Sequence, residues 1–471
     1  MSNNLLSLLA NAQTPEARAR LIHDAQLQNC LKKDANLYQI LRAAAIPHWF
    51  NQDILRALLP NLKADFDKLY DQLITSDFVE TIPQIQYCRI QKFNRKWILE
   101  DLFNREPEKF LSLSKLAAKY FSSGDEPMDR IEWLYHLIVS NDRMEATKHL
   151  WKIAAKWNAS FSYTELESLV NILMEQVDSE RVTGLAKGGI CFWQGQLALQ
   201  TKQGDIALQA LNVAAQELKQ DTGLLAKITR TIGKVQQELQ DEPKEALKNY
   251  EDALELYKRI GDWLNEAKTL RIIGKLYYSR EQPDQALEYY QQARELYREI
   301  GYSFGEARTL EAMGEVLTSS QKYHKALSYY QQVQSLYQNL DSPDSLWYGA
   351  QAYRAMNKLY VFLNLPELSK TAEQKAQELE ERFQHQWFSK AKNPYNLSDS
   401  QYETFKAIFA EPTRTDISCQ KVKELLKALG LRDKMGNKLK KIESQRDKEM
   451  KALSVVTLRH ELVYKGYELP F

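Results

Sequence analysis

Apolar residues recur at helical spacing through the central part of the chain. Between residues 266 and 301, apolar side chains return every three or four positions, pause at the polar stretch REQPD, and then resume. The stripe before the pause consists of Ala267, Leu270, Ile273 and Tyr277, and the stripe after it of Ala286, Tyr290, Ala293 and Tyr297. This spacing places apolar side chains on one face of a helix, and the Pro and Asp of the pause indicate a turn. The pattern therefore predicts two helices joined by a turn.

The same two-helix pattern occurs three times in the sequence. The second helix carries ALKNYEDALELY, ALEYYQQARELY and ALSYYQQVQSLY, which begin at Ala246, Ala286 and Ala326, 40 residues apart. The first helix of each copy carries a glycine, and these are Gly233, Gly274 and Gly314. A fixed period of this size marks stacked repeats, whose units bury a core only against their neighbours. We expect the small residues to let the two helices pack closely, and the tyrosines to fill the space towards the next unit.

These repeats resemble the tetratricopeptide repeat, in the longer form found in kinesin light chains and many bacterial signalling proteins. The matched positions are Ile232-Gly233, Ile273-Gly274 and Met313-Gly314, with the alanines and aromatics of the second helix. Three clear units run from about Leu225 to Leu340, and weaker units flank them. Upstream, Gly195, Ala207, Leu211 and Ala214 keep the register; downstream, Ala372 and Ala376 keep it, while Asn357 replaces the glycine. The resemblance implies a mainly α fold, with a five-unit solenoid over residues 186–384.

In such stacks the ligand usually lies on the concave face, which the first helix of each unit forms. Its exposed positions carry Lys227, Arg230 and Lys234 in one unit, Lys268, Arg271 and Lys275 in the next, and Arg308, Glu311 and Glu315 in the third. A row of cations can bind an acidic peptide or a C-terminal carboxylate through charge-assisted hydrogen bonds. The alternative is a solvated face whose cations pair with nearby Asp and Glu.

The N-terminal third predicts a different arrangement. Helical patterns around residues 51–59 and 63–75 are followed by two short alternating stretches, DFVET and QYCRIQ, and by the helical pattern NRKWILEDLF. Residues 40–105 resemble the winged-helix module of multidomain signal-transduction ATPases, and residues 106–185 their helical linker; residues 1–39 are expected to be helical. Those ATPases carry a phosphate loop, G-x-x-x-x-G-K-[ST], which this sequence lacks. We therefore expect a structural or protein-binding module, with DNA binding as the alternative.

The C-terminal segment predicts a second small module. After a linker at residues 385–398, residues 399–471 show three helical patterns and an alternating hairpin, which again resembles a winged helix. Between Gln420 and Lys451, 11 Lys and Arg face 5 Asp and Glu, a local charge of +6. Lys438, Lys440 and Lys441 are the candidates for contacts with nucleic-acid phosphates. Because acidic residues are interleaved, a solvated mixed-charge face is the alternative.

Composition limits the remaining possibilities. In 471 residues, 63 Lys and Arg balance 62 Asp and Glu, so the net charge of +1 predicts no general attraction to nucleic acid or membrane. The sequence shows no signal-peptide pattern and no apolar membrane span. Four widely spaced cysteines predict reduced thiols in a cytoplasmic protein.

Patterns that carry chemistry are missing from the sequence. The seven histidines lack zinc-ligand spacing, and no nucleophile elbow occurs. Cys419 and His460 form the one Cys–His pairing within the C-terminal module. We expect no catalytic activity, no metal and no cofactor. The sequence thus predicts a non-catalytic scaffold or adaptor for another protein with an acidic segment. Two alternatives are a nucleic-acid-associated regulator that uses the C-terminal module, and an adaptor to an ATPase or effector acting in trans.

Overall fold

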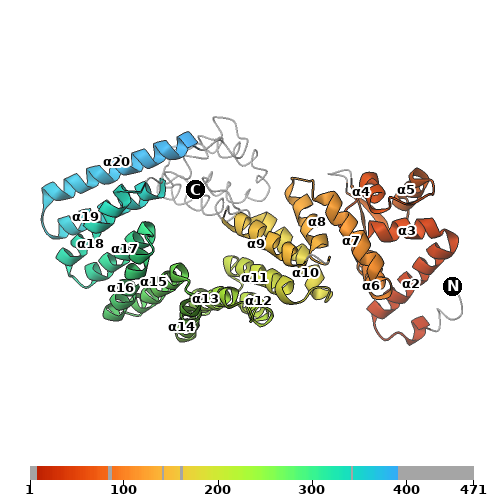
Figure 1. Cartoon of the computed structure of the whole chain (residues 1–471), viewed down its shortest axis with the longest axis horizontal. Coiled ribbons are helices and arrows are strands. Elements are labelled where there is room, and N and C mark those ends of the chain that lie inside the picture. Colours follow the sequence, from red (N-terminus) through yellow and green to blue (C-terminus); the bar gives the residue numbers. More distant parts are fainter. Residues whose placement is uncertain (1–7, 83–86, 141–142, 160–162, 341–342, 391–471) are drawn as a thin grey trace, which may run out of the picture. The chain divides into compact units, whose positions relative to one another are not determined.

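The computed structural model describes residues 8–82, 87–140, 143–159, 163–340 and 343–390, and these residues are mainly helical (Figure 1). The C-terminal module, with Lys438, Lys440 and Lys441 and the pair Cys419–His460, lies outside these ranges. No helix in the described part of the chain is both long enough and apolar enough to cross a membrane.

The described residues fall into two units. The first runs up to Lys156 and includes Glu165–Trp193; the second consists of Trp157–Thr164 and the residues from Gln194 onwards. The elements of the first part of the chain are α2 (Pro15–Lys33), α3 (Ala35–Ala44), α4 (Gln52–Leu58), α5 (Phe66–Ile74), β1 (Val79–Ile82), β2 (Tyr87–Ile90), α6 (Lys92–Arg105), α7 (Pro107–Phe121), α8 (Pro127–Leu137), α9 (Arg143–Ala159), α10 (Tyr163–Asp178) and α11 (Gly184–Gln200).

Local sequence explains where the early helices begin. Asp34, Asn51 and Asp65 each accept a hydrogen bond from a backbone N–H in the first turn of α3, α4 and α5, which satisfies a donor that the helix leaves unpaired. The strands β1 and β2 pair antiparallel, with Val79 opposite Ile90. The helices and strands expected between residues 51 and 102 are therefore present, while the winged-helix and linker assignments remain predictions.

A buried network of ion pairs lies inside the first unit. Glu132 on α8 is fully buried, and its two carboxylate oxygens lie 2.7 Å from Nδ1 of His48 and 3.3 Å from Nε2 of His136. On its other side His48 contacts Glu175 of α10 at 3.1 Å, and Arg95 of α6 reaches the same carboxylate oxygen at 2.8 Å. The network ties three helices to the segment between α3 and α4.

Burial and ion pairing act in opposite directions on the pKa values of this network. Burial opposes the ionisation of Glu132, but His48 and His136 outweigh it and hold the pKa of that carboxyl well below its usual range. Burial likewise opposes charge on Glu175, yet His48 and Arg95 lower its pKa to about 2. The charged forms of both carboxylates therefore contribute to the stability of the folded unit.

The rest of the second unit is a stack of helix pairs. Its elements are α12 (Gly204–Glu217), α13 (Thr222–Leu239), α14 (Pro243–Ile260), α15 (Trp263–Ser279), α16 (Pro283–Glu299), α17 (Ser303–Ser319), α18 (Tyr323–Gln338), α19 (Pro343–Phe362) and α20 (Pro366–Lys390). The pairs are α13 with α14, α15 with α16, α17 with α18, and α19 with α20 (Figure 1). We call the first member of each pair its A helix and the second its B helix. The A helix α17 also contacts the A helices α15 and α19, so the A helices share one face of the stack.

The small and large residues of the repeat occupy the places that the sequence predicts. A Cβ atom added at Gly274 would lie 2.8 Å from the ring of Tyr290 and 3.2 Å from the carbonyl oxygen of Ala286. Tyr290 is 2% exposed, and it packs in one cluster with Ala307 and Leu310 of the next unit. The interpretation of the repeated tyrosines as core residues is confirmed.

The turn between the two helices of each pair has a recurring backbone geometry. In the four pairs one residue of each turn has a left-handed φ between 54° and 59°, and these residues are Asp241, Glu281, Gln321 and Asn364; Lys202, between α11 and α12, has the same geometry with φ 60°. In the turns at Glu281 and Gln321, the N–H of the following residue bonds back to a carbonyl five positions earlier, at 3.0 Å and 2.8 Å. This is the hydrogen bond of the Schellman motif. Because residues other than glycine rarely adopt this backbone, its recurrence shows that the turns share one geometry.

In the last pair, polar contacts occur at the position where the earlier pairs have a glycine. Asn357, at the position of the repeat glycine, donates to Glu373 of α20 at 2.7 Å and accepts from Ser369 at 2.5 Å. Arg354 forms two hydrogen bonds of 2.7 Å with the carboxylate of Glu380. Side-chain bonds therefore join α19 to α20 where the earlier pairs use a glycine.

Candidate ligand groove

The structure brings most of the predicted cations together. Lys227, Arg230 and Lys234 lie on α13, Lys268, Arg271 and Lys275 on α15, and Arg308 on α17. A groove with a volume of about 530 Å³ runs over the A helices, and five of these cations line it: Arg230, Lys234, Lys268, Arg271 and Arg308. We call it the basic groove. Lys227 and Lys275 lie on the same helices without lining it.

Side chains of the A helices form hydrogen bonds with the backbone of their own helix, at its start and along its length. Asp221 accepts from the N–H of Leu224 at 2.9 Å, and Asp262 accepts from the N–H of Asn265 at 3.0 Å, so an aspartate caps both α13 and α15. Three threonines bond back to the carbonyl oxygen four residues earlier, at 2.7 to 2.8 Å, and these are Thr231, Thr269 and Thr309. The periodic apolar pattern did not single out these threonines, although they recur with the repeat.

Aromatic residues form another part of the lining, beside Gln196, Thr231, Ile272 and Gly305. Tyr297 was predicted as a core residue, and the other three aromatics were not predicted from the sequence. Tyr302 and Phe304 come from the connection between α16 and α17 and its first turn, and Tyr348 comes from α19. Phe304 and Tyr348 contact edge to face at 5.4 Å between ring centroids. A signal was present in the stretch GYSFG that follows α16, but it lies outside the helical stripes. The basic groove therefore combines cations with apolar ring faces.

Only part of the cationic row is neutralised by carboxylates. Lys234 lies 3.9 Å from Glu238, and Arg308 lies 2.6 Å from Glu311. Arg230 bonds to the neutral side chain of Asn265 at 3.1 Å and lies over the ring of Tyr257. Within the described residues, no carboxylate lies within ion-pair distance of Arg230, Lys268, Arg271 or Lys275. The alternative, a solvated face whose cations pair with nearby carboxylates, thus accounts for Lys234 and Arg308. It does not account for these four cations.

Crowding of like charge affects the lysines of the row. Burial and the neighbouring Arg230 lower the pKa of Lys227. Burial, Arg230 and Arg271 lower the pKa of Lys268, although Asp262 acts in the opposite direction. A lowered lysine pKa means that its surroundings disfavour positive charge. An anion bound in the basic groove would stabilise the charged lysines and raise their pKa values again.

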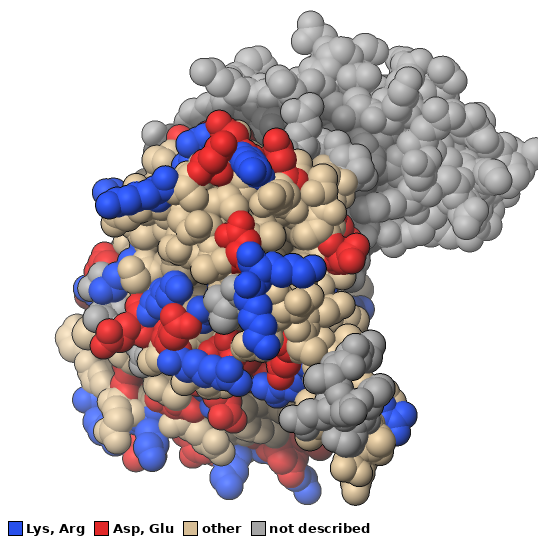
Figure 2. All heavy atoms as spheres, turned by 90° about the vertical axis from the view of Figure 1, so that its right-hand side faces the viewer, with Lys and Arg blue, Asp and Glu red and all other residues tan. Residues whose placement is uncertain are grey.

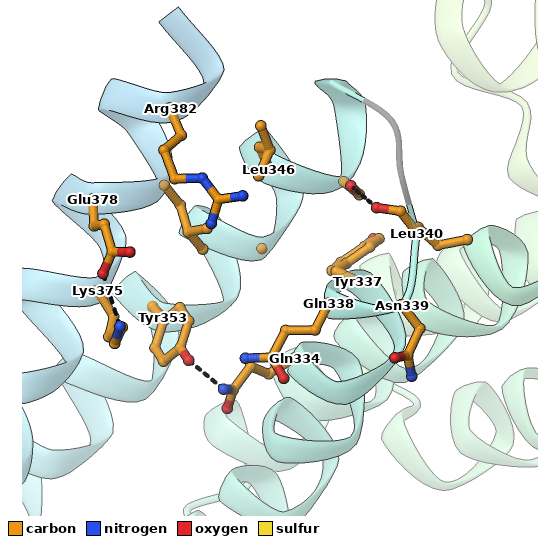
Figure 3. Close-up of a pocket in the computed structure, with 13 residues that line it drawn as sticks. Gln334, Tyr337, Gln338, Asn339, Leu340, Leu346, Tyr353, Lys375, Glu378 and Arg382 are labelled. Atoms are coloured by element: carbon orange, nitrogen blue, oxygen red, sulfur yellow. Dashed lines mark hydrogen bonds and ion pairs between the residues drawn. The ribbon is translucent and has the colours of Figure 1, made fainter. Parts of the chain in front are cut away.

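A second, smaller pocket lies between α18, α19 and α20 (Figure 3), with a volume of about 280 Å³. Gln334 donates to the hydroxyl of Tyr353 across it, and Lys375 pairs with Glu378 at 2.8 Å. Arg382 is a further cation of the lining. Because its charged groups are few and partly paired, we take the larger basic groove as the candidate site.

Charge elsewhere is mixed. Figure 2 views the molecule from the side that carries α3 to α6 in Figure 1, and Lys and Arg are interspersed there with Asp and Glu. Surface ion pairs occur in the first unit, such as that of Arg89 with Glu80 at 3.1 Å. The uncompensated row in the basic groove contrasts with this pattern.

Comparison with known families identifies the stack. Residues 224–299 match the tetratricopeptide repeat family, and residues 309–343 match a second description of the same repeat. The chain contains tetratricopeptide repeats. The matched ranges cover α14, α15, α16 and α18 and most of α13 and α17, with every predicted cation except Arg308, which precedes the second range by one residue.

Three solved structures are among those to which the chain is similar at low sequence identity. BtubC from P. vanneervenii is 15% identical, with 54% of this chain and 97% of that chain covered and a TM-score of 0.37. A signal transduction ATPase with numerous domains and a tetratricopeptide repeat sensor, from Pyrococcus horikoshii, is 12% identical, with 97% and 67% covered and a TM-score of 0.42. Rap protein complexed with Competence and Sporulation Factor is 12% identical, with 79% and 97% covered and a TM-score of 0.40. No curated protein matches the chain.

Proposed function

We propose that this chain is a non-catalytic protein-binding scaffold, and that its basic groove holds an acidic segment of a partner protein. The observation that supports the proposal most directly is that three cations of the groove, Arg230, Lys268 and Arg271, have no carboxylate partner in the described part of the chain. Carboxylates of a partner would supply the missing counter-charge and accept charge-assisted hydrogen bonds.

The size and lining of the groove fit a peptide segment. A volume of about 530 Å³ is within the range of ligand pockets in proteins, and it accommodates a few side chains at a time. The rings of Tyr302, Phe304 and Tyr348 offer apolar surface beside the cations. An extended acidic segment can therefore place its carboxylates on α13 and α15 and its aliphatic atoms against the rings.

Peptide binding tests the proposal directly. A fluorescein-labelled peptide rich in Asp and Glu is titrated with the full chain at low salt, and its anisotropy gives Kd. In the double variant Arg230→Glu/Arg271→Glu, we expect Kd to rise more than about tenfold, because each reversal replaces an attraction with a repulsion. The matched control is Lys248→Glu/Lys258→Glu, which makes the same change of charge at two exposed positions of the B helix α14.

The control decides the outcome. If both double variants weaken binding equally, the peptide responds to overall charge and the groove assignment is wrong. If neither variant changes Kd, the acidic segment binds elsewhere. A pull-down of protein and nucleic acid with the same variants then separates a protein partner from the alternative of nucleic-acid binding through the C-terminal segment.

A further inference from the structure

One cation of the basic groove already has an internal anion. Glu311 follows Arg308 by one helical turn on α17, and its Oε2 accepts a hydrogen bond of 2.6 Å from Nη1 of Arg308. The guanidinium group of Arg308 lies over the ring of Tyr348, 4.3 Å from its centroid. Arg308 lines the basic groove, whereas Glu311 is buried, with 8% of its surface exposed. The pair therefore lies at the wall of the groove.

The contacts of Glu311 are incomplete. Its second carboxylate oxygen, Oε1, is buried and has no hydrogen-bond partner in the structure. The buried hydroxyl of Tyr337 on α18 also lacks a hydrogen bond of good geometry, but it lies near enough to the carboxyl of Glu311 to lower the pKa of that group. A buried carboxylate with one unsatisfied oxygen is costly in its charged form. Glu311 is thus held in place mainly by Arg308, with the hydroxyl of Tyr337 close to its carboxyl group.

We propose that Glu311 is an internal competitor of the ligand: it occupies Arg308 in the empty groove, and an acidic partner must displace it to bind there. This inference rests on the proposed function of the groove. It makes Glu311 a determinant of specificity, because only a ligand whose carboxylate competes successfully for Arg308 gains that contact. It also makes binding sensitive to protonation, since a neutral Glu311 no longer neutralises Arg308.

Several charged and titratable groups surround Glu311, and one of them is a second carboxyl, that of Glu315. The charged and titratable groups around the pair come from five helices: Lys275 on α15, Tyr290 on α16, Arg308 and Glu315 on α17, Tyr330 and Tyr337 on α18, and Tyr348 on α19. Burial raises the pKa of Glu311 to about 7 although Arg308 opposes the shift. Burial also raises the pKa values of Tyr290, Tyr330 and Tyr337, which moves them further from neutrality. It raises the pKa of Glu315 as well, against Arg308 and Lys275, so the test includes a variant of Glu315.

The sign of the pH effect follows. As the pH falls through about 7, Glu311 takes up a proton, its charge disappears, and the guanidinium of Arg308 becomes available to the ligand. The carboxylates of an Asp- and Glu-rich peptide remain ionised there, because their pKa values lie near 4. The peptide should therefore bind more tightly at about pH 6 than at about pH 8.

A set of matched variants tests this, with the labelled acidic peptide and the full chain at about pH 6 and about pH 8. We expect the wild type to bind several-fold more tightly at the lower pH. Glu311→Gln should bind tightly at both. The control is Glu315→Gln, which removes the other carboxylate of α17 that lies near Arg308; Glu315 has no direct hydrogen bond to that arginine. Its pH dependence should stay that of the wild type.

Arg308→Gln gives an independent measurement if Glu311→Gln folds poorly, as checked by circular dichroism. Without the guanidinium group, Glu311 and the peptide have no cation to compete for. This variant should therefore bind the peptide more weakly, and its Kd should be the same at both pH values. If the peptide binds but Glu311→Gln and Arg308→Gln both keep the wild-type pH difference, the competitor role of Glu311 is wrong while the groove stands. If no acidic peptide binds any variant, the proposed function itself is wrong.

Discussion

At Gly274 the two helices of one repeat approach so closely that a methyl group has no room. The nearest atoms belong to the ring of Tyr290 and to the backbone carbonyl of Ala286. The ring is fully buried, and the carbonyl belongs to a helix, so neither can move without disturbing the core. Overpacking of this kind costs about 1–3 kcal/mol, and the better helix propensity of alanine offsets only about 1 kcal/mol.

We therefore expect Gly274→Ala to lower the thermal unfolding temperature of the stack. The control is Gly223→Ala, in the first turn of α13, where an added Cβ would meet its nearest atoms at ordinary contact distances of 3.5 and 3.6 Å. That change should be neutral or slightly stabilising. Equal effects from the two substitutions would contradict the packing argument. Unfolding followed by circular dichroism at 222 nm compares them.

The buried network around Glu132 makes a second prediction at the residue scale. Glu132→Gln removes the charge that pairs with both His48 and His136, and leaves their ring nitrogens in a buried site. Breaking a buried pair by removing one partner costs about 3–5 kcal/mol. Urea unfolding should show the first unit destabilised by that amount. Glu16→Gln, which removes an exposed partner of Lys96, should change stability by less than about 1 kcal/mol.

Acid should have a related effect on the same unit. The pKa of Glu175 is lowered to about 2 in the folded state, so its charge stabilises the fold above its ordinary pKa, and that contribution is lost as the pH falls towards the folded value. Stability measured from about pH 5 down to about pH 3 should fall less steeply in Glu175→Gln than in the wild type. An unchanged slope would show that Glu175 gains nothing from His48 and Arg95.

At the scale of the element, the turn between A and B helices sets the geometry of each pair. Gln321 has a left-handed backbone, with φ 59°, a conformation that costs a residue with a Cβ roughly 1 kcal/mol relative to glycine. Gln321→Gly should therefore stabilise the stack or leave its stability unchanged, although glycine substitution elsewhere in a helical protein is destabilising.

Gly261, with φ 67° and no atom near an added Cβ, gives the reverse test. Gly261→Ala should destabilise the stack by about 1 kcal/mol. Chemical denaturation measures both.

Regular elements could be predicted from the sequence because periodic residues determine them locally. The glycine–tyrosine pair of each repeat, such as Gly274 and Tyr290, determines how the two helices of a unit pack. The two residues lie close together in the chain. The basic positions were predictable for the same reason, since a helix fixes which residues share a face. The buried network was not predictable, because His48 lies 84 residues from Glu132 and 127 from Glu175. The aromatic lining was missed because Tyr302 and Phe304 lie at a connection, outside the helical stripes.

At the scale of the whole molecule, the net charge of +1 conceals a local concentration of cations. Attraction between the basic groove and an acidic ligand should weaken with salt, since the screening length falls from about 10 Å at 0.1 M to about 3 Å at 1 M. We expect the Kd of the acidic peptide to rise at least about fivefold across that range. The rise should be much smaller in Arg230→Glu/Arg271→Glu. A Kd independent of salt would mean that apolar contacts with the rings dominate.

The shared face of the A helices has a mechanical consequence. Each unit of a stack touches only its neighbours, so a force between two A helices acts on the angle between two units. Arg230 on α13 and Lys268 and Arg271 on α15 carry like charges on either side of one such boundary, and repulsion between them favours a wider angle. An anion bound by these three side chains together favours a narrower angle between the two units. A bound partner would therefore bend the scaffold, and surfaces far from the groove would change their spacing without touching the ligand.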